Sequence, residues 1–71
     1  MKTKFNYSKL LGRIKECGFT QAKLAKAIGI SKTTLSVKLN NLFSFTSEEI
    51  LAICKVLDIP TNEIGAYFYA V

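Results

Sequence analysis

The stretch TQAKLAKAIGISKTTLSVKLNN, residues 20–41, limits the possible folds more than any other part of the chain. Thr20 and Ser31 favour helix N-caps, because a side-chain oxygen can accept a hydrogen bond from a backbone N–H group of the first turn. Gly29 lies between them and can take the left-handed conformation that ends a helix at no steric cost. Apolar residues follow each cap at helical spacing. The stretch therefore predicts two short helices joined by a tight turn, which is the helix-turn-helix pattern.

Capping residues and apolar spacing outside this stretch predict three more helices. The first helix runs to about Cys17 and can be capped by Asn6 or Ser8. Thr46 and Glu49 form a capping box, in which each side chain accepts a hydrogen bond from the backbone N–H of the other residue. The other two helices outside the stretch lie at about 47–57 and 62–66, and Thr61 caps the second of them. The two helices of the stretch itself lie at about 21–28 and 32–39.

The sequence therefore predicts an all-α fold, a compact bundle of five helices in one domain that spans residues 1–71. Residues 1–5 form a short basic arm, and residues 66–71 form an aromatic tail. The tail has two possible structures. It finishes the last helix, with Phe68 closing the core, or it extends as a strand.

Apolar residues at helical spacing predict the core. In the loop after the helix-turn-helix, Leu42 and one of Phe43 or Phe45 are expected to turn inward. Gly12 costs a helix about 1 kcal/mol relative to Ala, so we expect it at a close contact between helices. The helical residues expected in the core are Leu10, Leu11, Ile14, Cys17, Leu24, Ala25, Ile28, Leu35, Leu39, Ile50, Ile53, Cys54, Leu57 and Ile64.

Positive charge is concentrated in the first half of the chain, whose net charge is +5 overall. Residues 1–41 hold nine Lys or Arg side chains against one Glu, which gives +8. Residues 42–71 hold one Lys against four acidic side chains, which gives −3. A basic half that contains the helix-turn-helix, followed by an acidic half, favours a polyanion on one face of the molecule.

Enzymatic and metal-binding functions are not expected. The sequence has no His, which excludes a Ser–His or Cys–His nucleophile, and its glycines form no phosphate-binding loop. Cys17 and Cys54 are too few to hold zinc, and we expect them to be buried thiols rather than a disulfide. We therefore expect no cofactor, metal or small-molecule substrate. No apolar run reaches the length of a membrane span, so we expect no membrane partner and a place in the bacterial host cytoplasm, associated with the nucleoid.

The segment TQAKLAKAIGISKTTLS resembles the helix-turn-helix of the lambda-repressor/Cro-like family, also called the XRE family. The resemblance extends over roughly residues 6–69, since FTSEEILAICKVLDIP and the aromatic end are similar to the final helices of small phage regulators in that family. It implies a lambda-repressor-like DNA-binding fold and a phage or prophage repressor or Cro-like regulator of transcription. The matching residues are Thr20, Gln21, Leu24, Ala25, Gly29, Ile30, Ser31, Leu35 and Ser36.

The resemblance also implies roles for individual residues, with the helix at about 32–39 lying in the major groove of DNA. Lys32 would donate to guanine, Thr33 and Ser36 would donate or accept, and Val37 would contact a thymine methyl group. Contacts to phosphates would position the protein without reading sequence. The residues implied for those contacts are Thr20, Gln21, Lys23, Ser31, Thr34, Lys38, Asn40 and Asn41.

Lys38 departs from the family pattern, because the position three residues past Leu35 usually holds an apolar residue that anchors the helix. We expect the helix to be rotated or to end early, which leaves Lys38 free to contact phosphate.

Two kinds of partner remain open. The resemblance implies a homodimer on a double-stranded DNA operator, and the surface expected to form it consists of Tyr67, Phe68, Tyr69 and Val71. The alternative is an antirepressor or modulator that keeps the fold but binds another phage repressor protein, which the polar recognition helix and the aromatic tail permit. The basic first half favours DNA, because phosphates explain clustered positive charge best. The main prediction is therefore a sequence-specific DNA-binding regulator.

Overall fold

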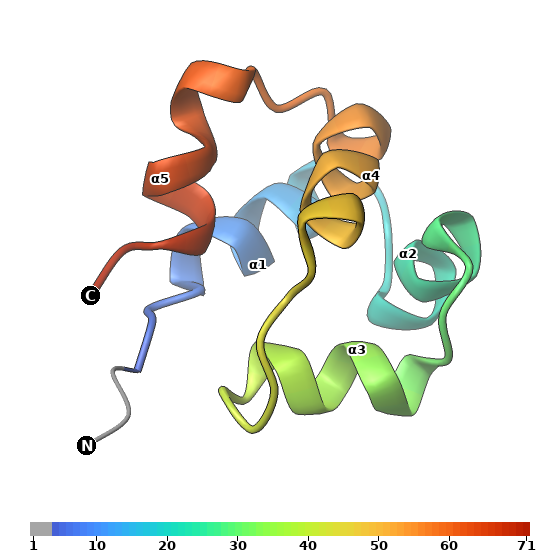
Figure 1. Cartoon of the computed structure of the whole chain (residues 1–71). Helices are drawn as coiled ribbons and strands as arrows, with labels where there is room; N and C mark the ends of the chain where they lie inside the picture. The colour runs from blue at the N-terminus through green and yellow to red at the C-terminus, as the bar shows by residue number, and fades with distance from the viewer. Residues whose placement is uncertain (1–3) are drawn as a thin grey trace.

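The computed structural model describes residues 4–71 as an all-helical fold (Figure 1). These residues form five α-helices, one short 3₁₀ helix and no strand, so the predicted all-α bundle of five helices is confirmed. Residues 1–3 of the predicted basic arm lie outside the described residues. The elements are α1 (Ser8–Glu16), α2 (Gln21–Ile28), α3 (Lys32–Leu39), α4 (Ser47–Leu57), the 3₁₀ helix η1 (Thr61–Glu63) and α5 (Ile64–Phe68).

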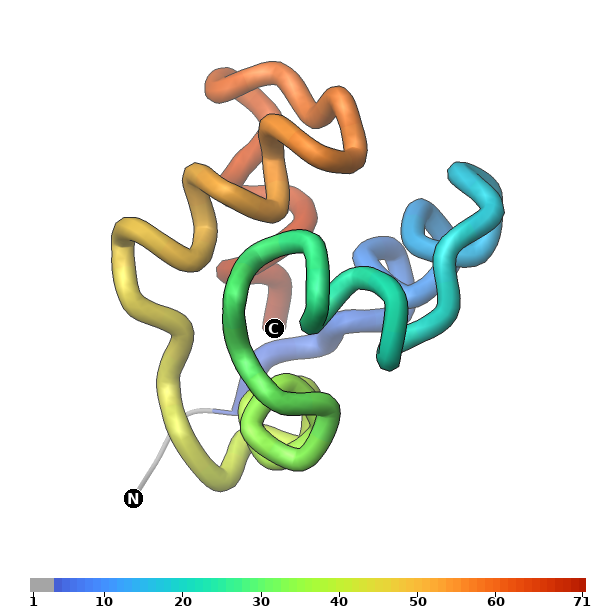
Figure 2. The backbone as a smooth tube through the Cα atoms, turned by 90° about the vertical axis from the view of Figure 1, so that its right-hand side faces the viewer, coloured from blue at the N-terminus to red at the C-terminus, as the bar shows by residue number. Residues whose placement is uncertain are grey.

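The helix-turn-helix consists of α2 and α3, joined by residues 29–31. α3 runs across the bottom of Figure 1, and the view of Figure 2, turned by 90°, shows it nearly end on. α2 packs against both α3 and α4, whereas α5 packs against α1 and α4. α4 therefore joins the helix-turn-helix to the other two helices. None of the helices in residues 4–71 is long and apolar enough to cross a membrane.

An apolar core lies between the helices. Phe45 is packed against it while Phe43 is 66% exposed, so Phe45 is the residue of the loop that turns inward. The core consists of Tyr7, Leu10, Ile14, Leu24, Ala25, Leu35, Ile50, Ile53, Cys54, Leu57, Ile59 and Phe68, with Ile28, Leu39 and Ile64 partly buried against it.

Four predictions about buried positions are wrong. Leu11 is exposed because the inner face of α1 is formed by Leu10 and Ile14. Leu42 is 60% exposed, since it lies beyond the turn that ends α3. Cys17 is exposed at the end of α1. Gly12 meets no close helix contact, because a Cβ atom added there would have nothing within 4 Å.

Left-handed residues end each of the first four α-helices. Gly18 and Gly29 have φ angles of 77° and 82°, the conformation that glycine adopts without strain. Asn41 and Asp58 have φ angles of 64° and 55°, a conformation that Asn and Asp tolerate better than most residues with a side chain. The backbone N–H of Ile59, which follows Asp58, donates across the turn to the carbonyl of Cys54 (2.8 Å).

The N-terminal caps of α2, α3 and α4 are those predicted, whereas α1 has Tyr7 at its N-cap without a side-chain hydrogen bond, and Asn6 Oδ1 accepts instead from the N–H of Ser8 (2.9 Å). Thr20 and Ser31 each accept a hydrogen bond from the backbone N–H three residues later, at 3.1 and 3.0 Å. Thr46 and Glu49 form the predicted capping box, with distances of 3.1 and 2.8 Å. The cap predicted at Thr61 is wrong, because a 3₁₀ helix begins there without a side-chain cap.

The first and last described residues lie side by side, next to the loop after α3 (Figure 1). The backbone N–H of Asn6 donates to the carbonyl of Ala70 (2.6 Å). The side chain of Asn41 bonds Phe5 twice, since its Oδ1 accepts from the N–H of Phe5 and its Nδ2 donates to the carbonyl, both at 2.9 Å. The ring of Phe5 meets that of Tyr69 edge to face, with centroids 5.5 Å apart. Three segments that are distant in sequence therefore meet here.

The aromatic tail combines parts of both predicted structures. α5 ends at Phe68, whose side chain closes the core. Residues 69–71 follow the helix without forming a strand, and the carbonyl of Ala70 accepts a hydrogen bond from the backbone N–H of Asn6.

Candidate functional site

The outer side of α3 carries the four residues predicted to read bases. Lys32 and Thr33 are exposed, and Ser36 and Val37, about one turn later, are half-buried. Residues three and four apart share one face of a helix, and this face lies away from the fully buried Leu35. The structure thus brings these four side chains together on a polar face that carries one charge.

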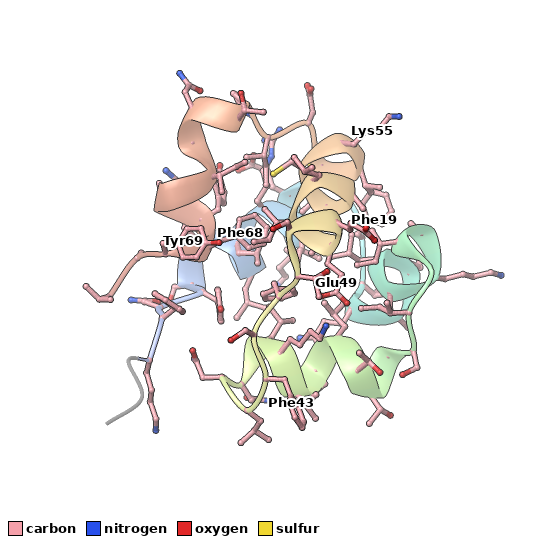
Figure 3. The ribbon with its side chains drawn as sticks, viewed as in Figure 1. Phe19, Phe43, Glu49, Lys55, Phe68 and Tyr69 are labelled. Carbon is pink, nitrogen blue, oxygen red and sulfur yellow. The ribbon has the colours of Figure 1, made fainter. Side chains whose placement is uncertain are left out.

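Lys38 lies inside the molecule and not on this face. Its ammonium contacts the carboxylate of Glu49 on α4, with Nζ and Oε1 2.5 Å apart, and both side chains are almost buried. Figure 3 shows Glu49 directed from α4 toward α3. α3 neither rotates nor ends early, because it continues to Leu39 with Lys38 pointing inward. The prediction that Lys38 is free to contact phosphate is therefore wrong.

The carboxylate of Glu49 takes part in two structural features, the ion pair with Lys38 and the capping box of α4. Burial by itself raises the pKa of Glu49, but the hydrogen bonds from Lys38 and from the backbone and hydroxyl of Thr46 outweigh burial and lower the pKa below its usual value. The charged carboxylate therefore holds α3 through Lys38 while it caps α4 through Thr46. This ion pair occupies the place of the apolar anchor that the resemblance implied.

The other residues predicted to contact phosphate are also mainly engaged within the fold. The two hydrogen bonds of Asn41 to Phe5 use one N–H of its side-chain amide and its carbonyl oxygen, so Asn41 has a role inside the fold and its phosphate contact stays a prediction. Asn40 folds back on α3 and donates to the carbonyl of Ser36 (2.9 Å). The remaining candidates lie around the starts of α2 and α3, where Thr20 and Ser31 are caps, Ser31 and Thr34 bond each other, Gln21 is half-buried and Lys23 is exposed.

The surface predicted for a dimer or a partner is only partly present. Phe68 is 1% exposed and packs edge to face against Phe45, so it cannot belong to that surface (Figure 3). Tyr67 is half-buried, and its ring lies 4.7 Å below the ammonium of Lys9 in a cation–π contact. Tyr69 and Val71 are exposed.

Next to Tyr69 is a hollow of about 140 Å³ that the sequence did not predict, here called the aromatic hollow. Its walls hold edge-to-face ring pairs, such as Tyr7 with Phe45 at 5.6 Å between centroids. Burial raises the pKa of Tyr7, and the neighbouring Tyr69 raises it further. The residues that line the hollow are Phe5, Tyr7, Ser44, Phe45, Ile50, Phe68 and Tyr69.

A sequence signal for this hollow does exist. The segments FNY, FSF and YFY alternate or cluster aromatic residues, but nothing in the sequence indicates that the three segments meet.

Exposed apolar side chains accompany the hollow. Leu42 and Phe43 directly precede Ser44, and Tyr69 and Val71 lie in the tail. All four are more than half exposed. We call these four residues the apolar end. These side chains occur in two segments that line the hollow, and exposed apolar surface of this kind is a candidate for contact with a partner.

Comparison with known proteins adds a family and a related structure. A family model described as "Protein of unknown function (DUF739)" matches residues 3–71. The chain is similar to the solution structure of the modulator of repression (MOR) of the temperate bacteriophage TP901-1 from Lactococcus lactis, with a TM-score of 0.79 and 40% sequence identity. That similarity covers 92% of this chain and 88% of the other. None of the curated proteins matches.

These findings correct the main sequence-based predictions. The assignment to the lambda-repressor/Cro-like (XRE) family is wrong, because the matching family is a different one. The prediction of a sequence-specific DNA-binding repressor or Cro-like regulator is wrong as well, because the similar structure is that of a modulator of repression. Neither comparison supports a DNA operator or a homodimer. The helix-turn-helix is present, but one backbone arrangement can serve different partners.

Proposed function

Because the chain belongs to the DUF739 family and folds like a phage modulator of repression, we propose that it modulates repression in a phage by binding a repressor protein. The similarity to MOR carries this proposal, because it extends over nearly the whole of both chains and includes far more than the helix-turn-helix. The chain is then an antirepressor or modulator, which the sequence left open as the alternative. Its partner is a phage repressor, and its setting is the bacterial host cell.

The apolar end supports a protein partner. The centre of a protein–protein interface is apolar and rich in aromatic residues, whereas interfaces with DNA are more polar and strongly basic. Leu42 and Phe43 are among the most exposed large apolar side chains of the described residues, and no core contact requires them there.

The polar residues around α3 support the same conclusion. Lys38 and Asn41 are engaged inside the molecule, which leaves α3 with Lys32 as its exposed cation. Phosphate contacts supply a large share of the affinity of DNA-binding proteins, and they come largely from Lys and Arg.

Calorimetric titration tests the proposal. The purified repressor encoded in the same phage genome is titrated into this chain, without DNA. We expect a complex with a Kd of about 1 μM or tighter and a negative heat-capacity change, because apolar surface is buried. In cells, co-expression of this chain is expected to restore a reporter gene that the repressor silences.

A duplex of that repressor's operator serves as the control ligand. Sequence-specific binding of the operator by this chain alone, together with no measurable binding of the repressor, would overturn the proposal. Binding of the repressor without loss of repression in the reporter cell would overturn the modulating role.

A further inference from the structure

We infer that the aromatic hollow anchors the repressor by receiving one apolar side chain of a segment that acidic residues flank. The inference rests on the proposed function and deepens it, since it names the site on this chain and the chemistry of the segment that enters it. The size of the hollow, the rigidity of its walls and the charges around it each support it.

The size of the hollow fits one side chain. Its volume of about 140 Å³ is close to that of a cavity of about 150 Å³ that accommodates benzene. A Leu, Met or Phe side chain therefore fills it, whereas two such side chains do not. Six of its seven lining residues are apolar or aromatic. Interfaces commonly draw most of their binding energy from a few such side chains seated in well-packed pockets.

The walls of the hollow are already in place without a partner. Phe5 is fixed by its two hydrogen bonds to Asn41 and by the ring of Tyr69. Phe45 is held between the rings of Tyr7 and Phe68, each 5.6 Å away. A preformed pocket loses little conformational freedom when it is filled, so more of the contact energy contributes to affinity.

The charges around the hollow favour acidic neighbours of the inserted side chain. The three segments that build it, residues 4–9, 41–50 and 64–71, contain Lys4, Lys9 and the Lys-paired Glu49, with Glu48 as their other acidic residue. Among residues 4–71 the side-chain ion pairs join Arg13 to Glu16 and Lys38 to Glu49, so neither lysine is in an ion pair, although Lys9 also lies over the ring of Tyr67. Complementary charge around an apolar anchor speeds association and fixes its orientation.

The apolar end extends the contact beyond the hollow. Leu42 and Phe43 lie on the loop that supplies Ser44, and Val71 follows the tail residue Tyr69. A segment whose anchor enters the hollow can cover these side chains, which excludes water from the anchor.

Two substitutions in the hollow test the inference by calorimetric titration with the same repressor. Ser44→Phe fills the hollow from its exposed loop position, and Tyr69→Ala removes one wall. Each is expected to weaken binding at least about tenfold. The matched controls are Asn62→Phe and Leu51→Ala, which change exposed residues outside the hollow, and they are expected to change affinity less than about twofold.

A charge reversal tests the acidic flank. Lys4→Glu is expected to slow association about threefold to tenfold, whereas Lys55→Glu, on α4, leaves the rate unchanged. Equal effects of the two reversals would contradict the acidic flank.

The outcomes separate this inference from the proposed function. If the unmodified chain binds the repressor and Ser44→Phe and Tyr69→Ala bind it equally well, the hollow is not the anchor while the proposed function stands. If the unmodified chain does not bind the repressor, the proposed function fails. Thermal unfolding checks the fold of each variant. If Tyr69→Ala is unstable, the repressor affinity of Ser44→Phe alone tests the inference.

Discussion

Lys38 occupies an inward position on α3, where its ammonium contacts Glu49 instead of water. Removal of one member of a buried ion pair leaves the other charge unpaired and costs about 3–5 kcal/mol, whereas replacement of both by neutral groups is often tolerated. We expect Lys38→Leu to lower the free energy of unfolding by about 3 kcal/mol, and Lys38→Leu with Glu49→Gln to recover most of this loss. Gln preserves the capping box, so the double variant isolates the charge.

Urea unfolding of the single and double variants measures this effect. A double variant no more stable than Lys38→Leu alone would mean that the packing of the Lys38 stem, and not the unpaired charge of Glu49, determines the loss.

Acid is expected to weaken the same ion pair. The pKa of Glu49 is lower in the folded chain than its ordinary value of 4.5, so the unfolded chain binds the proton more readily. The contribution to stability is therefore complete above pH 4.5 and is lost as the pH falls through the lowered pKa. We expect the urea midpoint of the unmodified chain to fall more steeply below that pH than the midpoint of Glu49→Gln. Parallel curves for the two proteins would contradict this role of Glu49.

At the scale of the helices, α3 and α4 are followed by residues with the same backbone conformation but with different side-chain contacts. Asn41 and Asp58 both have positive φ angles, but only Asn41 also holds Phe5 through its side chain. Glycine relieves the backbone conformation at either position. We expect Asp58→Gly to leave stability unchanged or to raise it by up to about 1 kcal/mol. We expect Asn41→Gly to lower stability by about 1–2 kcal/mol, because two hydrogen bonds are lost.

Thermal unfolding of the two variants gives the comparison. A change of about 1 kcal/mol shifts the melting temperature of a domain this small by about 4–8 °C. Equal shifts for the two variants would mean that the hydrogen bonds between Asn41 and Phe5 contribute nothing.

The helices themselves were the part of the fold that local sequence predicted well. Thr20, Ser31 and the box of Thr46 and Glu49 are caps whose partners lie within three residues, so their chemistry is visible in the sequence. The glycine stop at residue 29 is equally local.

The contacts that build the site could not be predicted in the same way. Asn41 bonds a residue 36 positions away, and the hollow gathers three separate segments. Lys38 is predicted to be free because it stands where the family pattern has an apolar anchor, and its actual partner, Glu49, already has a local role as a cap. Phe68 is predicted both to close the core and to belong to a partner surface, because the tail alone does not show which of its aromatic residues faces the core.

At the scale of the whole molecule, the helix-turn-helix explains both the resemblance and the error in function. The packing of α2 on α3 is a property of the backbone and the core, whereas the partner is selected by exposed side chains. The basic first half pointed to phosphates, but its charges are divided between the helix-turn-helix, the ion pair of Lys38 and the lysines near the aromatic hollow.

The salt dependence of repressor binding distinguishes these surfaces. A protein that makes 6–10 phosphate contacts loses about 10³–10⁵-fold in affinity between about 50 and 200 mM salt. Apolar burial is screened little, so we expect repressor affinity to change less than about tenfold over the same range, measured by titration. A much steeper loss would assign binding to the exposed lysines of α2 and α3, which are Lys23, Lys26 and Lys32.

The hydrogen bond between Asn6 and Ala70 places both ends of the described chain beside the aromatic hollow. An affinity tag or fused reporter domain attached after Val71 would therefore stand next to the surface that is to be tested, and could hide it from the repressor. Immobilisation through Cys17, which is exposed at the end of α1 and does not line the hollow, leaves that surface open to the solution.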